Sequence, residues 1–144
     1  ENISRIKRDT LIEKYISNPF LIKGRKTNLR VYALISGIDP LRIYFHKEGY
    51  LHICTAKFSL DIKKLKNKFI HIANQGVSSK NNPAYVYSKG NNDEITSTIS
   101  MKLAEKVINK SGGNFTKFKE KLIDTSIKVL ITLSQSYSKK LKKQ

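Results

Sequence analysis

Residues 13–30 of this chain read EKYISNPFLIKGRKTNLR, and residues 39–49 read DPLRIYFHKEG. In the first stretch a proline and a glycine separate short apolar runs, which divides the chain into brief segments. Thr10–Ile16 predicts a short strand, and Pro19 ends it because proline disfavours helix in the residue before it. The stretch therefore favours a β-rich start with basic side chains carried on extended segments.

The residues that follow predict three strands joined by turns. Asn28–Ser36 alternates in polarity and is rich in β-forming residues. Turn residues at Gly37–Pro40 lead to a second strand over Leu41–His46, and a turn at Lys47–Gly49 leads to a third over Tyr50–Thr55. The pattern predicts an antiparallel meander, which on pattern alone could be a plain sheet without chemistry.

The middle of the chain is more polar. Asp61–Asn67 predicts a basic connector with one or two helical turns, and Phe69–Asn74 predicts a strand that leads into a loop. Residues 76–92 contain proline, glycine and paired asparagines, which is typical of a mobile loop. We therefore expect an irregular stretch between the sheet and the end of the chain.

Two helices are expected in the last third of the chain. Glu94–Asn109 places apolar residues on one helical face, and Ser111–Gly113 supplies the glycines that commonly end a helix. A second helix, capped by Asn114, is expected from about Phe115 with its own apolar stripe. Such stripes are far more often core than a surface that holds a cofactor.

The order of these blocks resembles the tubulin–tyrosine ligase-like family. Its pattern is roughly (Q)KYI-x-NPLLI-x-GRKFDLR-xYVL, then DPLRIY, then EG-xx-R, with HLTN further on; residues 68–74, KFIHIAN, resemble F-x-HLTN. The resemblance covers Leu11–Asn74, and residues 75–144 add a compatible helical pattern. It implies an α+β fold: part of an ATP-grasp domain, an antiparallel β-meander followed by two helices, with residues 1–144 as one partial domain. It also implies ATP-driven addition of an amino acid to a protein, usually tubulin, in the cytoplasm at the cytoskeleton or cilium.

The resemblance assigns an adenine site to Lys14, Tyr15 and Ile16. The edge of an adenine ring can bond with backbone N–H and C=O groups of an extended segment, while apolar side chains cover its faces. The competing interpretation is that Tyr15 and Ile16 are ordinary core residues of a strand. The neighbouring blocks of the family pattern favour the adenine site.

The basic positions of the family's K-x-D-x-R segment are Lys26 and Arg30 here, with Asn28 between them. Alternate residues of a strand share a face, so these three side chains should lie together over one cleft. The resemblance implies that Lys26 and Arg30 hold ATP and the acyl-phosphate intermediate, where a cation stabilises phosphoryl charge. Asn28 replaces an Asp and can still hydrogen-bond a ribose hydroxyl.

Three positions depart from the family pattern: Asn28, His52, which stands where the pattern has a catalytic Arg, and Ala73, which stands where it has Thr. A neutral imidazole cannot replace a permanent forked cation. Ala73 and Asn74 fall at nucleotide-binding positions of the HLTN block. His71 keeps its family position, although a histidine on an apolar strand is more often structural.

The sequence contains no spacing typical of a metal site, and none of its residues is assigned to metal. Family members bind Mg²⁺ through an Asp and a later E-x-N pair, and Asp124 has no such pair after it. We therefore expect the Mg²⁺ ligands to lie outside these 144 residues, and the 144 residues alone to be inactive. The start at Glu1 rather than Met agrees with a fragment whose partners include the rest of its own chain.

The chain carries a formal charge of +17, from 28 basic and 11 acidic residues. Such a charge attracts acidic partners, and the resemblance favours acidic tubulin tails or microtubules. Codon bias toward Lys, Asn and Ile could also supply much of the charge. A catalytically degenerate module that binds microtubules is the main alternative function, and nucleic acid is a distant third. No run is apolar enough to span a membrane, and the single Cys54 cannot form an internal disulfide.

Overall fold

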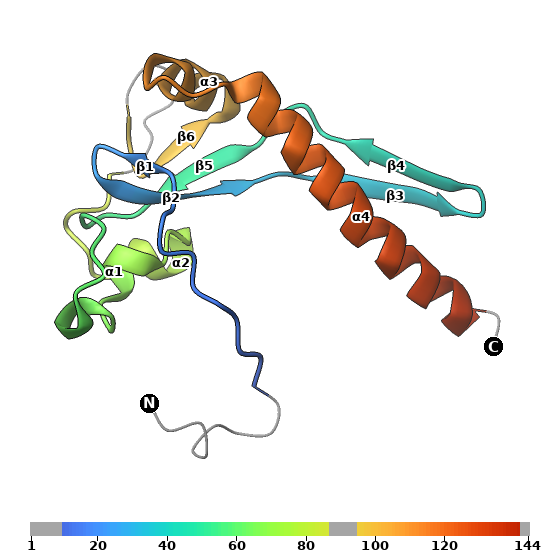
Figure 1. Ribbon diagram of the computed structural model, residues 1–144, viewed down its shortest axis with the longest axis horizontal. Helices are drawn as coiled ribbons and strands as arrows, with labels where there is room; N and C mark the ends of the chain where they lie inside the picture. The colour runs from blue at the N-terminus through green and yellow to red at the C-terminus, as the bar shows by residue number, and fades with distance from the viewer. Residues whose placement is uncertain (1–9, 87–94, 142–144) are drawn as a thin grey trace.

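The computed structural model describes residues 10–86 and 95–141, with side chains described up to residue 136. The elements are β1 (Leu21–Ile22), β2 (Arg25–Arg30), β3 (Ala33–Ile38), β4 (Leu41–Phe45), β5 (Tyr50–Ile53), η2 (Ile62–Lys64), α1 (Lys68–His71), α2 (Gln75–Ser78), β6 (Thr98–Ser100), α3 (Met101–Lys110) and α4 (Phe115–Leu141). The α+β class and the antiparallel sheet followed by helices, both expected from the sequence, are confirmed (Figure 1).

A long two-stranded ribbon forms the backbone of the fold. Its inner part pairs β2 with β5, and its outer part is the β3–β4 hairpin. The His46 amide donates to the Tyr32 carbonyl at 2.9 Å, which joins the two parts. β1 and β6 extend the inner part to the order β1-β2-β5-β6. The expected strand Asn28–Ser36 is therefore split between β2 and β3. The third expected strand is β5, which pairs with β2.

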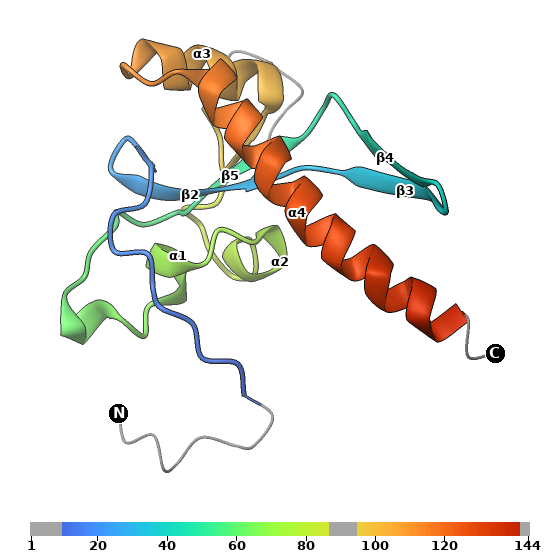
Figure 2. The same cartoon turned by 45° about the vertical axis from the view of Figure 1, so that its right-hand side comes forward.

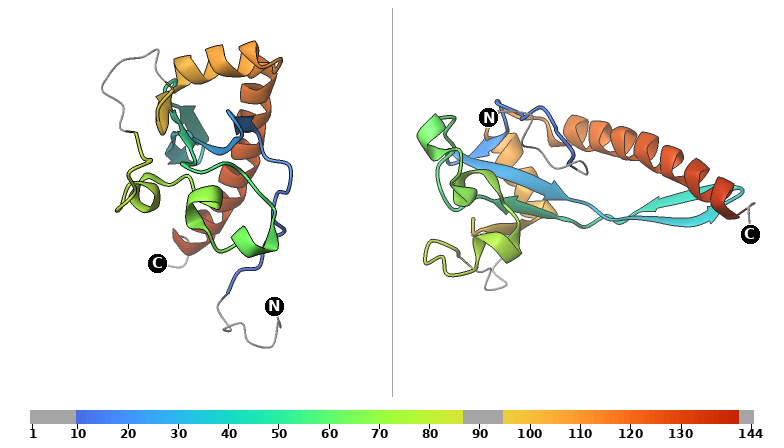
Figure 3. Two further views of the ribbon diagram at one scale, coloured as in Figure 1. Left: turned by 90° about the vertical axis from the view of Figure 1, so that its left-hand side faces the viewer. Right: turned by 90° about the horizontal axis from the view of Figure 1, so that it is seen from below.

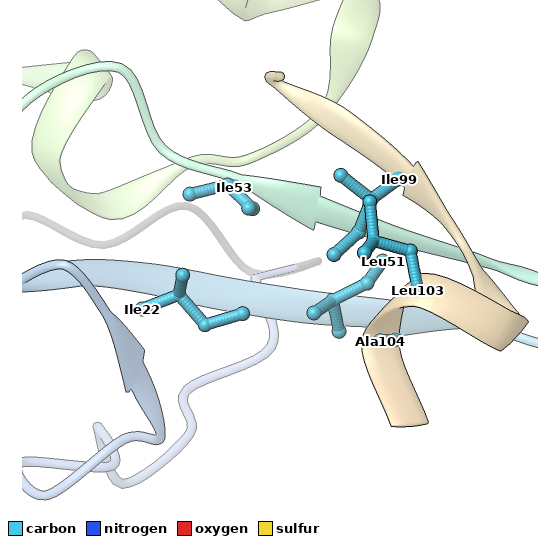
Figure 4. Packing of buried hydrophobic residues seen from close by; sticks show 6 residues of the cluster. All are labelled: Ile22, Leu51, Ile53, Ile99, Leu103 and Ala104. Carbon is cyan, nitrogen blue, oxygen red and sulfur yellow. The ribbon is translucent and has the colours of Figure 1, made fainter. Parts of the chain in front are cut away.

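The hydrophobic core lies on one face of the inner sheet, under α3. Ile22, Leu51, Ile53 and Ile99 of the sheet pack with Leu103 and Ala104 of α3, as Figure 4 shows. α1 and α2 lie on the opposite side of the sheet (Figures 1 and 2). Burial of these apolar side chains fixes which face of β2 and β5 points away from α3.

The end of the chain leaves this core and runs beside the β3–β4 hairpin (Figure 3). α3 ends at Lys110, and Gly112 follows with a φ of 80°, the left-handed conformation that glycine tolerates. The Asn114 side chain then accepts a hydrogen bond from the Lys117 amide at 2.9 Å, so the expected cap is confirmed. On the hairpin, Leu34 and Tyr44 remain 62% and 58% exposed.

Two expected strands are wrong, and in each case a local signal explains the difference. Thr10–Ile16 forms no strand; Leu21–Ile22 pairs instead, through a tight turn with positive φ at Lys23 and Gly24. Phe69–Asn74 is not a strand, because the Asn67 side chain caps α1 by accepting from the Phe69 amide at 3.0 Å.

The expected helix Glu94–Asn109 begins later than the pattern predicts, and Glu94 itself lies outside the described residues. Thr98–Ser100 pairs with β5 as β6, and the Ser100 hydroxyl accepts from the Leu103 amide at 3.3 Å to cap α3. The expected loop 76–92 overlaps α2 at its start. Residues 87–92 lie outside the described part of the chain, so the mobility of the loop stays a prediction.

Gly49 allows the ribbon to approach α3. A Cβ at this position would collide with the Arg30 carbonyl oxygen and lie 2.7 Å from the Met101 methyl group. We expect Gly49→Ala to destabilise the fold by roughly 1–3 kcal/mol, because the backbone of β2 must move. Urea unfolding measures this change. Gly24→Ala, which meets no atom but has a φ of 72°, is the matched control for strain without collision. A smaller loss for Gly49→Ala than for Gly24→Ala would contradict the prediction.

Candidate functional site

The face of the inner sheet that points away from α3 carries the polar residues. Lys26, Asn28 and Arg30 alternate along β2, and Leu29 between them packs toward the core. In the β2–β5 register, Asn28 lies opposite His52 and Arg30 lies opposite Tyr50. Register partners in an antiparallel pair share a face. The expectation that Lys26, Asn28 and Arg30 lie on one face is therefore confirmed.

A hollow of about 520 Å³ opens where the segment before β1 passes over this face. Its lining includes Lys14, Tyr15 and Ile16 from that segment, and Lys26 and Asn28 from β2. The volume falls in the range of roughly 300–1,000 Å³ that small-molecule pockets occupy. The fold thus brings Lys26 and Asn28 together with the segment that the sequence analysis assigned to adenine. Arg30, which was expected over the same cleft, shares their face of β2 but is not among the residues that line the hollow.

Tyr15 and Ile16 are not core residues. Their side chains are 44% and 70% exposed, and their segment belongs to no strand. The interpretation of these residues as ordinary strand core is therefore wrong. The exposed segment instead presents its side chains and its backbone groups at the hollow.

Lys26 is held by specific contacts within this site. Its Nζ donates to the His71 carbonyl oxygen at 3.1 Å and to the Tyr15 hydroxyl at 3.4 Å. The Tyr15 hydroxyl also lies 2.8 Å from His71 Nδ1. The sequence placed His71 on a strand; the structure places it at the end of α1, beside the site rather than in the core.

His52 is buried, with 7% of its surface exposed. Its Nδ1 lies 3.0 Å from the Thr98 hydroxyl of β6, and the Tyr85 hydroxyl lies 3.5 Å from the same oxygen. Burial, with a smaller contribution from the Arg30 charge, lowers the pKa of His52. At neutral pH the imidazole is therefore uncharged and supplies no cation to the site.

The departures from the family pattern at positions 28 and 52 lie opposite each other across the ribbon. The pattern has Asp at the first position and Arg at the second, and these positions are direct partners across β2 and β5. An oppositely charged pair across the strands becomes a neutral Asn28–His52 pair. Because both charges disappear together, neither residue is left opposite an unpaired charge.

Ala73 and Asn74 follow α1 and are held by other contacts. Ala73 is 2% exposed, and the Asn74 side chain caps α2 by accepting from the Gly76 amide at 2.9 Å. Among the described contacts, none joins either residue to Lys26, Asn28 or Arg30. The sequence analysis missed Thr98 and assigned His71 to structure; only the position of α1 and β6 beside the sheet reveals their contacts.

The described residues also bear on metal binding, thiol chemistry and membrane insertion. Among the described residues, no group of three or more His, Cys, Asp or Glu could hold a metal ion. Cys54 is fully buried, and burial raises the pKa of its thiol, which keeps it protonated. None of the described helices has the length and apolar character needed to cross a membrane.

We expect the stability of the protein to fall below about pH 6.5 through His52. Its pKa is lower in the folded state than the ordinary value of 6.5, so the unfolded chain binds the proton more tightly. The stabilisation is complete above 6.5 and is lost as the pH falls toward the folded-state pKa. Urea unfolding between pH 8 and 5 measures this loss. The loss of stability between pH 8 and 5 should be smaller in His52→Gln and unchanged in the control His46→Gln. A pH profile of His52→Gln equal to that of the native protein would contradict the prediction.

Comparisons with known proteins all point to one family. A family model described as the tubulin-tyrosine ligase family matches residues 1–143. A tubulin monoglutamylase from Homo sapiens is 32% identical over 129 residues, which cover 88% of this chain and 10% of the relative. A tubulin polyglutamylase from Homo sapiens is 27% identical over 127 residues, with the same two coverages of 88% and 10%.

A tubulin glycylase from Tetrahymena thermophila is 36% identical over 75 residues, which cover 52% of this chain and 6% of the relative. The chain therefore spans at most a tenth of the length of these three relatives. The match of the family model over nearly every residue establishes the relationship: the chain belongs to the tubulin–tyrosine ligase family.

Proposed function

We propose that this chain is the nucleotide-binding part of an ATP-dependent ligase that attaches an amino acid to a carboxylate of tubulin. The observation that carries the proposal is that Lys14, Tyr15, Ile16, Lys26 and Asn28 line one and the same hollow. Residues that the family pattern assigns to nucleotide, from two separate segments, meet there. Relatives named as tubulin monoglutamylase, polyglutamylase and glycylase support tubulin as the acceptor.

The residues divide the work by their chemistry. The backbone of Lys14–Ile16 suits the edge of an adenine ring, and the Tyr15 and Ile16 side chains suit its faces. Asn28 offers an amide to a ribose hydroxyl, and the Lys26 ammonium and the Arg30 guanidinium offer donors to phosphate oxygens. When bound, ATP supplies the phosphoryl group that activates a carboxylate for attack by an amine. In this proposal, the Mg²⁺ ligands lie in another part of the protein.

The acceptor follows from charge. The chain carries a formal charge of +17, and the connector between β5 and α1 exposes Lys57, Lys63, Lys64 and Lys66 with few acidic neighbours. A basic surface attracts an acidic polypeptide and speeds its association. We propose acidic tubulin tails as that partner and the microtubule cytoskeleton as the place of action.

A second function is favoured by a specific observation. The cross-strand pair of Asn28 and His52 is neutral, and the HLTN position at Ala73 has lost its hydroxyl. A site with these changes binds nucleotide phosphate less well than the family pattern allows. The alternative is therefore a catalytically degenerate module that binds microtubules or another acidic partner.

Incorporation of a labelled amino acid into tubulin by the full-length protein distinguishes the two functions. If the ligase proposal holds, incorporation requires ATP, and Lys26→Met lowers it roughly a hundredfold because a phosphate donor is lost. Lys63→Met, on the exposed connector, is the matched control for loss of one positive charge. Salt-sensitive binding to microtubules with no incorporation would instead support the degenerate module.

Restoration of the family's charges tests whether positions 28 and 52 act as a pair. Asn28→Asp with His52→Arg should raise ATP-dependent incorporation about tenfold or more, because a buried pair and a phosphate-stabilising cation return together. His52→Arg alone should lower thermal stability, since it buries a cation near Arg30 with no partner. Equal effects from the single and the double variants would show that the two positions are independent.

A further inference from the structure

The segment that precedes β1 is attached to the sheet mainly by side chains. It belongs to no strand over residues 10–20, yet it forms one wall of the 520 Å³ hollow. Two attachments hold it: the Thr27 hydroxyl donates to the Phe20 carbonyl at 3.0 Å, and Tyr15 contacts Lys26 and His71. The position of this wall therefore depends on a few specific contacts.

Tyr15, Lys26 and His71 form a closed cluster of three contacts. Tyr15 and His71 are joined at 2.8 Å, Lys26 and Tyr15 at 3.4 Å, and Lys26 reaches the His71 carbonyl at 3.1 Å. The cluster unites three separate parts of the chain: the segment before β1, the strand β2 and the helix α1. Each contact restrains the other two, which is the arrangement in which hydrogen bonds reinforce one another.

Ring contacts fix the orientation of the cluster as well. The rings of Tyr15 and His71 meet edge to face at 5.6 Å and 82°, and the rings of Phe58 and His71 meet at 6.1 Å and 79°. The Lys26 ammonium lies 4.8 Å from the centre of the Tyr15 ring, close enough for a cation–π interaction. His71 thus contacts two aromatic rings, and the Tyr15 ring lies beside the Lys26 ammonium.

These contacts change what Lys26 can do. The tip of a surface lysine normally samples many rotamers, and ordering it costs side-chain entropy. Here the ammonium already makes two hydrogen bonds, which leaves one of its three N–H donors for an incoming group. Because this side chain is already ordered in the free protein, a ligand that binds Lys26 loses less free energy to ordering it.

We propose that Tyr15 and His71 are positioning residues for Lys26, which hold its ammonium at the hollow so that its remaining donor meets a nucleotide phosphate. The proposal rests on the nucleotide function proposed above. It assigns to His71 a role in binding, transmitted through the Tyr15 hydroxyl, and it gives Tyr15 a second role beside that of covering the adenine.

Binding of a fluorescent ATP analogue to the full-length protein tests the proposal. Tyr15→Phe keeps the ring and removes the hydroxyl, and should raise the Kd about threefold to tenfold, the effect of losing one hydrogen bond. His71→Asn places an amide where Nδ1 lies, whereas His71→Gln places it where Nε2 lies. Positioning through Nδ1 predicts that Asn preserves affinity better than Gln, and a merely structural imidazole predicts that both fail alike.

Two controls keep the test specific. Tyr44→Phe removes a hydroxyl from an exposed tyrosine of the β3–β4 hairpin, and should leave the Kd unchanged. The double variant Tyr15→Phe with His71→Gln should have a Kd no higher than the higher of the two single-variant values, because both changes break the same contact. Additive losses, or an unchanged Kd in Tyr15→Phe, would overturn the proposal.

Acetylation of lysines, followed by peptide mass spectrometry, tests the positioning without any nucleotide. Lys26 should react several-fold more slowly than the exposed Lys63, and Tyr15→Phe should speed the reaction of Lys26 alone. Equal rates in the native protein and in Tyr15→Phe would overturn the proposal. If Lys26 is protected but no nucleotide binds, the cluster stands and the nucleotide function fails, so the two failures are distinguishable.

Discussion

The register between β2 and β5 is the constraint on which the rest of the structure depends. It places Leu29, Leu51 and Ile53 under α3, and it leaves Lys26, Asn28 and Arg30 on the opposite face. A shift of one residue would bury the charges and expose the core. The apolar packing that stabilises the fold therefore also determines which side chains form the site, and the chain cannot keep one without the other.

The same register gives a new meaning to the departures from the family pattern. Viewed along the sequence, Asn28 and His52 are two unrelated losses separated by a hairpin. Viewed across the ribbon, they are partners, and His52 is further held by Thr98 from β6. Loss of an acid and a base from opposing positions leaves the net charge of this face unchanged. The fold is thus preserved while the chemistry available at this face changes.

The sequence predicted the parts of the structure that depend on local periodicity or on family blocks. The strand Leu41–His46, the cap at Asn114 and the shared face of Lys26 and Arg30 are confirmed. The errors arise where a single capping side chain outweighs an apolar pattern, as at Asn67 and Ser100. The contacts of His71 and Thr98 could not be predicted, because they join elements far apart in the chain. The roles of the site residues stay predictions.

The β3–β4 hairpin extends beyond the core with an apolar outer face, on which Tyr32, Leu34 and Tyr44 are each about half exposed or more. α4 runs beside the hairpin and also exposes Val129 and Leu133. Apolar side chains on paired strands and on a neighbouring helix are a recognised route to self-association. Preparations of these 144 residues alone therefore carry an aggregation hazard that has nothing to do with the site. Solubility will depend on what covers the hairpin more than on the integrity of the inner sheet.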